Sequence, residues 1–377
     1  MMNERLDTVI DRAIEEERIV GTVVLVAEDG QVVYRRAAGF ADREDGVPVR
    51  EDTVFRFASL TKAIVSVAAL ALIERGDLRL DGPVTDWIPS FRPRFGDEEE
   101  SVITVRHLMT HTSGLTYGFM ELPDSRFHQA GVSDGLDQPG LSMEENLRRI
   151  SSVPLNHTPG RRWNYSVATD VLGEVIARCA GIPLPDLVER LVTGPLGMRN
   201  TSFRVGDGVA LANPYGDGDP RPVPMAEPHR ILFGRSAVLY SPARAFDAAS
   251  FPSGGGGMVG TAPDFLAFLE VLRTGGAPVL KPESVLALTT NAIGDLRVNA
   301  VGPGWGFGLG VAVLKDPVLA ETPESPGTWR WGGAYGHSWF VDPVRRLSMV
   351  ALTNTAIAGM NGPYPDGIRD AVYGVVR

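Results

Sequence analysis

The sequence predicts an α+β protein in which both ends of the chain contribute strands to one antiparallel sheet. Two observations lead to this class: β-rich runs gather near both termini, and helical periodicity dominates the segments between them. The chain has 377 residues, 44% of them hydrophobic, which is enough for one large domain or two intimately joined ones. We therefore interpret the helical segments as a region inserted into the sheet-forming part.

The N-terminal elements are predicted to be a helix followed by a hairpin. Residues 3–18 carry four apolar side chains at helical spacing: Leu6, Val9, Ile10 and Ile14. Two β-rich runs, 21–27 and 31–36, flank Glu28-Asp29-Gly30, and an Asp-Gly turn between such runs favours a β-hairpin. A third strand is predicted over residues 53–57.

A buried helix is predicted to begin at Leu60. Its residues from Ala63 to Ile73 are apolar on almost every face, which is typical of a helix enclosed by protein, and Gly76 stands where a C-cap is expected. Further helices are predicted over residues 104–110, 143–150, 168–180 and 184–192. Residues 117–142 form a long loop, and we expect an ordered lid because the loop has apolar anchors. These anchors are Tyr117, Phe119, Met120 and Phe127.

Strand character returns in the last third of the chain. Strands are predicted over residues 306–313, 328–331, 338–341 and 347–353, and a helix near 364–375. We therefore expect residues 1–57 and 240–377 to form an α/β region with the antiparallel sheet. Residues 58–239 are expected to form a mostly helical region within the same integrated unit, with approximate boundaries.

Charge and composition exclude several classes of partner. The net charge is −10 and the sequence pI is about 5.2, and the absence of a basic stripe argues against nucleic acid. The N-terminus is charged, and the longest apolar run, Ala63 to Ile73, is far shorter than the ~20 residues that span a bilayer. We expect a soluble, cytoplasmic protein with no membrane partner. The one cysteine, Cys179, is expected to be a small core residue, because no electropositive neighbour would activate it.

The first candidate for chemistry is Ser59-Leu60-Thr61-Lys62, where a strand-like run changes into the buried helix. Residues three apart share a helix face, so the Lys62 amine can approach the Ser59 hydroxyl and serve as the base that a weak nucleophile needs. The alternative is that Ser59 caps the helix and Lys62 lies on the surface. A lysine in the first turn of so apolar a helix is unusual, because the helix dipole disfavours cations there.

Two further motifs stand later in the chain. Tyr165-Ser166-Val167 precedes the helix predicted at 168–180; taken alone, a tyrosine there is a half-buried packing residue. Trp331-Gly332-Gly333-Ala334-Tyr335-Gly336-His337 lies among the late strands, where three glycines allow close approach of a backbone or a substrate. Its alternative is a bulged edge strand with a core tryptophan. The six histidines do not cluster at metal-binding spacing, so no metal or other cofactor is expected.

Together and in this order, these motifs resemble the family VIII carboxylesterases, which are similar to class C β-lactamases and D-alanyl-D-alanine peptidases. The resemblance covers roughly residues 5–375. It rests on the three motifs and on two supporting blocks, Leu108-Met109-Thr110-His111-Thr112-Ser113-Gly114-Leu115 and Pro195-Leu196-Gly197-Met198. The resemblance implies a β-lactamase/DD-peptidase-like α+β fold, with the active site in the groove between the sheet and the helical region.

The resemblance also implies the roles of single residues. Ser59 would be the nucleophile, activated by Lys62 and Tyr165 as a pair, and the backbone N–H groups of Ser59 and Ala334 would form the oxyanion hole. Which member of the pair accepts the proton is left open. We place six residues in the substrate pocket: Trp331, Gly332, Gly333, Tyr117, Phe119 and His337.

Two departures from the β-lactamase pattern indicate the substrate class. Val167 replaces a carboxamide in the second motif, and Trp331 replaces the lysine that helps to bind a substrate carboxylate. Both changes favour neutral short-chain esters as small-molecule substrates, and they are compatible with removal of a 3′-acetyl group from a cephalosporin. A β-lactamase, a D-aminopeptidase, an acyltransferase or a silent binding module on the same fold are the alternatives. The physiological substrate and the oligomeric state stay open.

Overall fold

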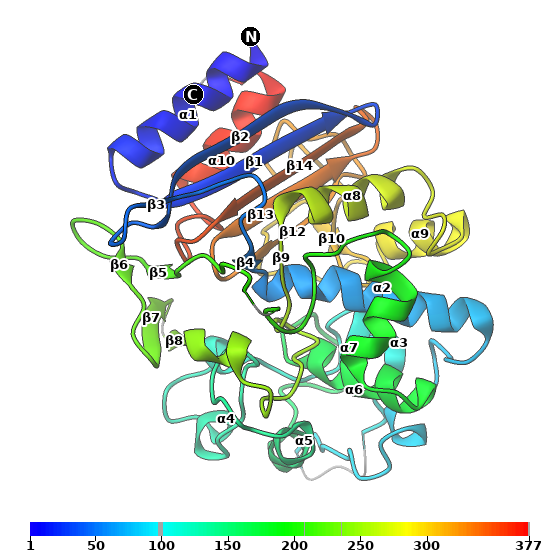
Figure 1. Ribbon diagram of the computed structural model, residues 1–377. Coiled ribbons are helices and arrows are strands. Elements are labelled where there is room, and N and C mark those ends of the chain that lie inside the picture. The colour runs from blue at the N-terminus through cyan, green and yellow to red at the C-terminus, as the bar shows by residue number, and fades with distance from the viewer. Residues whose placement is uncertain (97–100, 207, 235, 376–377) are drawn as a thin grey trace.

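The structure is a computed structural model that describes residues 1–96, 101–206, 208–234 and 236–375. Within these residues the largest sheet has eight strands in the order β10-β11-β12-β13-β14-β1-β2-β3, and every neighbouring pair is antiparallel (Figure 1). Its strands are β1 (Gly21–Glu28), β2 (Gln31–Asp42), β3 (Val47–Pro48), β10 (Trp305–Phe307), β11 (Ala312–Leu314), β12 (Trp329–Gly333), β13 (His337–Asp342) and β14 (Leu347–Thr353).

The two ends of the chain meet in the middle of this sheet, where β1 pairs with β14 from Thr22↔Thr353 to Glu28↔Leu347. Side chains alternate between the two faces of a strand. Val24 and Val26 therefore join one apolar cluster, while Val23 and Leu25 join another on the opposite face. Both faces of β1 are buried, which explains why its sequence is apolar without alternation.

Helices cover both faces of the sheet. The terminal helices α1 (Met2–Glu15) and α10 (Pro363–Tyr373) pack against each other on one face, as Figure 1 shows. On the other face, α8 (Ala262–Arg273) contacts β1 and β14 and separates them from the helical part of the molecule.

The helical part is centred on α2 (Thr61–Arg75), whose first twelve residues are all buried. Gly76 ends α2 in the left-handed conformation, with φ of 78°, as expected for a glycine C-cap. The surrounding helices are α3 (Val105–Met109), α4 (Arg126–Gln129), α5 (Met143–Ser152), α6 (Ala168–Ala180), α7 (Leu184–Val188) with a π-turn over Glu189–Thr193, and α9 (Pro282–Thr289).

Smaller elements connect the two parts. Two-stranded sheets are formed by β4 (Phe55–Arg56) with β9 (Val259–Gly260), β5 (Tyr215–Gly216) with β6 (Val223–Pro224), and β7 (His229–Phe233) with β8 (Ser236–Tyr240). The 3₁₀ turns are η1 (Ala58–Leu60), η2 (Val84–Asp86), η3 (Gly118–Met120) and η5 (Pro242–Phe246).

The observed elements confirm the predicted fold class, the N-terminal helix and hairpin, the buried helix and the last strands. The prediction of one strand over residues 306–313 is wrong, because β10 and β11 are separated by a turn. Gly310 in this turn has φ of 128°, and an added Cβ would lie 2.3 Å from the Ser66 hydroxyl oxygen, so the chain bends where it passes over α2. The sequence also left α8, α9 and the hairpin β7–β8 unpredicted.

The division into an α/β region and a helical region stays a prediction. The positions of the strands and helices along the chain are compatible with it. All eight strands of the large sheet come from residues 1–57 and 240–377, and helices α2 to α7 come from residues 58–239. Cys179 is half-buried rather than enclosed, and burial raises the pKa of its thiol. No helix in the described part of the chain is long and apolar enough to cross a membrane.

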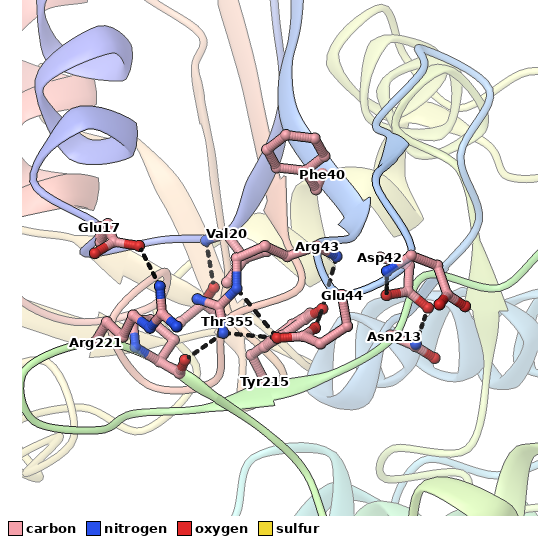
Figure 2. Close-up of polar contacts among 12 residues, drawn as sticks. Glu17, Val20, Phe40, Asp42, Arg43, Glu44, Asn213, Tyr215, Arg221 and Thr355 are labelled. Atoms are coloured by element: carbon pink, nitrogen blue, oxygen red, sulfur yellow. Dashed lines mark hydrogen bonds and ion pairs between the residues drawn. The ribbon is translucent and has the colours of Figure 1, made fainter.

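A polar network attaches the segment around β5 to the end of β2 (Figure 2). The hydroxyl of Tyr215 donates to Glu44 and accepts from the backbone N–H of Arg43 at 2.8 Å, and the Asn213 amide donates to Asp42. The N–H of Tyr215 donates to the Asn354 carbonyl, and its own carbonyl accepts from Ala356. This network therefore fixes the start of the loop that follows β14.

Candidate active site

Ser59 lies in η1, at the point where the chain turns from β4 into α2. The backbone N–H of Phe57 donates to the Met258 carbonyl, which fixes the entry to this turn. Ala58 then has φ of 46°, a left-handed conformation that is strained for a residue other than glycine. The alternative that Ser59 caps α2 is wrong, because α2 has no side-chain cap at its N-terminus.

The Ser59 hydroxyl oxygen lies between the two residues that the motifs singled out. Lys62 Nζ donates to Ser59 Oγ at 3.1 Å, because the two side chains are three residues apart along the start of α2. Tyr165 Oη donates to the same oxygen at 2.7 Å from the segment that precedes α6. Two segments far apart in sequence thus bring three polar groups to one point.

Lys62 is 2% exposed and has no ion pair with a carboxylate among the described residues. Its Nζ also donates to the Gly255 carbonyl at 2.6 Å, and it lies 5.1 Å and 4.8 Å from the ring centroids of Tyr117 and Tyr165. Ring faces and a carbonyl therefore balance its charge in place of a carboxylate. Asp170 lies behind this contact, accepting from the Ser253 hydroxyl and the Gly255 N–H, and burial raises the pKa of its carboxyl.

An aromatic cage holds Tyr165, which is 8% exposed. Trp331 Nε1 donates to its phenolic oxygen at 3.1 Å, and the rings of His111 and Tyr117 lie 5.0 Å and 4.9 Å from its ring centroid. His111 Nδ1 is 3.2 Å from the Ser166 hydroxyl, and complete burial lowers the pKa of His111 well below its usual value. The sequence reasoning missed this support, although His111 lies in one of the blocks that carried the resemblance.

Ser59 opens into a cleft of about 510 Å³. Much of its wall near Ser59 is aromatic, and its lining includes Tyr117, Phe119, Trp331 and Gly332, four of the residues proposed from the sequence for the substrate pocket. Ala334 lines it too, and its carbonyl accepts a hydrogen bond from the Tyr240 hydroxyl at 2.9 Å. The lining also includes four polar side chains, those of Arg330, Ser338, Asp366 and Arg369.

Two predicted pocket residues are placed elsewhere. His337 has no exposed surface; its Nε2 lies 2.6 Å from the Arg56 carbonyl, and its Nδ1 accepts from the Thr353 N–H. The prediction that His337 lines the pocket is therefore wrong, because β13 turns its side chain into the protein. Gly333 is also covered, and an added Cβ would lie 2.5 Å from the Phe57 carbonyl oxygen, so its close approach serves packing.

The sequence reasoning missed the walls that close the cleft around the aromatic residues. They come from the hairpin β7–β8 through Phe233 and Val238, from residues 299–301, and from residues 357–362 after β14. Ile357 has φ of 63°, which is rare for a β-branched residue, and it follows directly after the segment that the network in Figure 2 attaches to β5. These segments have ordinary apolar composition, so no local signal marks them.

Hydrogen bonds fix the start of residues 117–142, the predicted ordered lid, at the cleft; a role as a lid stays a prediction. Asp134 accepts hydrogen bonds from the N–H groups of Gly118 and Phe119, which holds η3 at the cleft, while Phe127 lies in the core. Burial raises the pKa of Asp134 well above its usual value. Among the described residues, no group of three His, Cys, Asp or Glu side chains could hold a metal ion.

Comparisons relate the chain to known proteins. The sequence model of the Beta-lactamase family matches residues 6–371. Esterase EstB of Burkholderia gladioli is 48% identical over 372 residues, covering 98% of this chain and 94% of the relative. The lovastatin esterase of Penicillium rubens is 27% identical, with 93% of each chain covered. The solved structure of EstCE1, described as a hydrolase with promiscuous acyltransferase activity, superposes with a TM-score of 0.95 at 44% identity over 98% of each chain.

Proposed function

The chain belongs to the Beta-lactamase family of serine hydrolases, and we propose that it is a carboxylesterase that hydrolyses neutral short-chain esters through an acyl-enzyme on Ser59. The observation that carries the proposal is the contact of Ser59 Oγ with both Lys62 Nζ and Tyr165 Oη, at 3.1 and 2.7 Å, at the wall of an aromatic cleft. The 48% identity to an esterase supports the same reaction class.

In the first half of the reaction, Ser59 Oγ attacks the ester carbonyl carbon and passes its proton to the Tyr165–Lys62 pair. The carbonyl electrons move to the oxygen, which becomes an oxyanion. When this intermediate collapses, the bond to the alcohol breaks, and the alcohol leaves with the proton that the pair held. In the second half, water repeats the attack on the acyl group, which releases the acid and restores Ser59.

The oxyanion is expected to accept hydrogen bonds from the backbone N–H groups of Ser59 and Ala334. Both residues line the cleft, and β12, which precedes Ala334, packs against η1, which carries Ser59. The Gly333 carbonyl, which shares a peptide unit with the Ala334 N–H, accepts from the Gly336 N–H at 2.8 Å, and this bond orients the donor. A fixed donor is worth more than a mobile one, because no reorganisation is needed when the charge forms.

A second candidate is acyl transfer to an alcohol in place of water. The aromatic and Met side chains beside Ser59 favour it, because an apolar wall lowers the local competition from water: Tyr117, Phe119, Met120, Phe233, Trp331 and Met360. The description of EstCE1 as a hydrolase with promiscuous acyltransferase activity points the same way. β-Lactamase and D-aminopeptidase activities are less well supported, because Trp331 and Val167 offer no partner to a substrate carboxylate. A cytoplasmic location stays a prediction from the sequence.

The test of the esterase proposal compares wild type with Ser59→Ala on p-nitrophenyl acetate and butyrate. We expect kcat to fall by about 10⁴-fold or more, as for other serine nucleophiles, with unchanged thermal unfolding. A fluorophosphonate should modify Ser59 and leave Ser59→Ala unlabelled by mass spectrometry. Ser113→Ala is the control, since Ser113 is a buried serine that does not line the cleft. Modification of Ser113 or Ser236 in the wild type would contradict the assignment.

A further inference from the structure

A second cavity, of about 50 Å³, lies behind the backbone of the active site. Three arginines from different segments line it: Arg56 on β4, Arg204 in the segment between the π-turn at Glu189–Thr193 and β5, and Arg244 in η5. Tyr335 and residues 256–259 complete much of the wall. The cavity belongs to neither the cleft nor the catalytic groups described above.

Arg56 and Arg244 are both buried, each with 9% of its surface exposed. Arg56 donates to the carbonyls of Ala212 and Pro242, each at 2.9 Å, and its Nε is buried without a hydrogen-bond partner. Arg244 donates to the Phe251 carbonyl at 2.7 Å and to two other carbonyls. In the described part of the chain, neither guanidinium forms an ion pair with a carboxylate, so two buried positive charges face one cavity.

Asp247 also lines the cavity, but the acidic groups nearby are engaged in other hydrogen bonds. Glu227 accepts from the Ser241 hydroxyl and from the Ala243 N–H, and Asp247 accepts from the Ala249 N–H and the Ser250 hydroxyl. Asp137 accepts from the Ser133 hydroxyl, and burial raises the pKa of its carboxyl, which weakens it further as a counter-ion.

Carbonyl oxygens and aromatic rings balance part of this charge: Arg56 lies 5.8 Å from the Tyr335 ring centroid, and Arg244 lies 4.3 Å from that of Phe251. Burying a guanidinium without a carboxylate partner still costs free energy, because arginine does not lose its proton and its hydration is removed. Burial lowers the pKa of both Arg56 and Arg244, which reflects the same cost. An anion in the cavity would lower the free-energy cost of burying the two guanidinium groups.

We propose that this cavity binds a small monovalent anion of the size of chloride, held by Arg56 and Arg244. The volume fits this size class: a single water needs roughly 10–15 Å³, so 50 Å³ admits a halide with a water and leaves little room for a larger hydrated anion. Tyr335 adds a third donor. Its side chain lines the cavity, and burial raises the pKa of its hydroxyl to about 12, so the phenol keeps its proton.

The position of the cavity couples the anion to catalysis. Arg56 stands three residues before Ser59, Gly256 follows the Gly255 whose carbonyl holds Lys62, and Tyr335 follows Ala334. The anion therefore joins the three backbone segments that carry the nucleophile, the lysine contact and the oxyanion donor. Binding itself is independent of the proposed esterase function, whereas an effect on turnover rests on it.

The first experiment replaces potassium gluconate by potassium chloride at constant ionic strength and follows thermal unfolding and ester hydrolysis. We expect chloride to raise Tm by at least about 2 °C, with saturation, because a ligand that binds only the folded state stabilises it. Bromide should act similarly, and sulfate should not. Equal Tm in chloride and gluconate would overturn the proposal, whether or not the esterase is active.

Variants and diffraction locate the site. Tyr335→Phe should keep the fold and weaken the apparent chloride affinity several-fold, and Arg56→Met should abolish the chloride response. The control is Arg345→Gln, which alters an arginine that packs over Tyr373 far from the cavity and should respond like wild type. If Arg56→Met fails to fold, bromide-soaked wild-type crystals decide. An anomalous peak between Arg56 and Arg244 is expected, and a cavity holding only water would contradict the inference.

Discussion

Lys62 and Tyr165 contact the same oxygen, so their contributions to catalysis are expected to be inseparable. Each single variant, Lys62→Met or Tyr165→Phe, removes one of the two groups that share the proton of Ser59, and we expect kcat to fall by about 10²–10⁴-fold. The kcat of the double variant should be little lower than that of either single variant, because the pair acts as a unit.

The matched control for this cycle is Lys281→Met, since Lys281 is exposed at the start of α9 and should leave kcat unchanged. All variants are compared by kcat on the same p-nitrophenyl ester. Losses that simply multiply in the double variant would mean that the two residues act independently.

His337 is expected to make the stability of the fold depend on pH. Its neutral ring uses both nitrogens: Nε2–H donates to the Arg56 carbonyl, and Nδ1 accepts from the Thr353 N–H. Burial lowers the pKa of His337 to about 4, against 6.5 for an unperturbed histidine. Between these values the unfolded chain binds a proton that the folded chain does not, so stability is complete above pH 6.5 and is lost as the pH falls towards 4.

Protonation of this one group lowers the free energy of unfolding by about 3 kcal/mol, because each pKa unit corresponds to about 1.36 kcal/mol. Urea unfolding between pH 7 and pH 4 measures it, with His337→Gln as the comparison, since glutamine does not titrate. We expect a flatter pH dependence for the variant, on top of a lower stability at pH 7. Identical slopes in both proteins would show that His337 is not the group responsible.

At the scale of elements, we expect the end of β12 to limit which substrates the site accepts. A β-lactam carries a carboxylate, and each charge-assisted hydrogen bond to it contributes about 1.5–3 kcal/mol, or roughly 10- to 150-fold in affinity. Trp331 and Gly332 supply no such bond, and the indole N–H of Trp331 already donates to Tyr165. We therefore expect slow or no opening of penicillins.

A cephalosporin with a 3′-acetyl ester tests this directly, since it carries a neutral ester and a β-lactam ring in one molecule. Mass analysis after incubation should find the deacetylated product with an intact ring. Ring-opened product formed as fast as simple esters are hydrolysed would favour a β-lactamase instead.

At the scale of the whole molecule, the cleft is lined by segments from three parts of the chain, and we expect them to limit the length of the acyl group. Phe119 comes from the segment after α3, Phe233 from β7, and Ile357 from the loop after β14; the first two rings contact each other in the cleft wall, with centroids 5.9 Å apart. We expect kcat/KM to be highest for acetyl to butyryl esters and to fall for long chains. Phe119→Ala should shift the optimum towards longer chains, because it removes part of this wall.

A series of p-nitrophenyl esters of increasing length measures the optimum for wild type and variant. Phe246→Ala is a suitable control, since Phe246 is an exposed aromatic residue that does not line the cleft. A steady rise of kcat/KM with chain length in the wild type would indicate a lipase-like site and contradict the proposal.

The local parts of this protein were accessible from the sequence alone. The helical spacing of Ser59 and Lys62, the apolar run from Ala63 to Ile73 and the Asp-Gly hairpin depend on residues that are close in the chain, and their geometry follows from the period of the element. The order of the three motifs indicated the family, and with it a site in which Tyr165 lies beside Ser59 and Trp331 lines the same cleft.

Only the tertiary structure decided what surrounds these groups. The burial of His337, the turn at Gly310 and the walls at Phe233 and Ile357 arise where segments far apart in the chain pack together. The same holds for the arginine cavity, because Arg56 and Arg244 share no motif and stand 188 positions apart in the sequence. Such contacts depend on the sum of many packing interactions rather than on any local pattern, so sequence periodicity does not predict them.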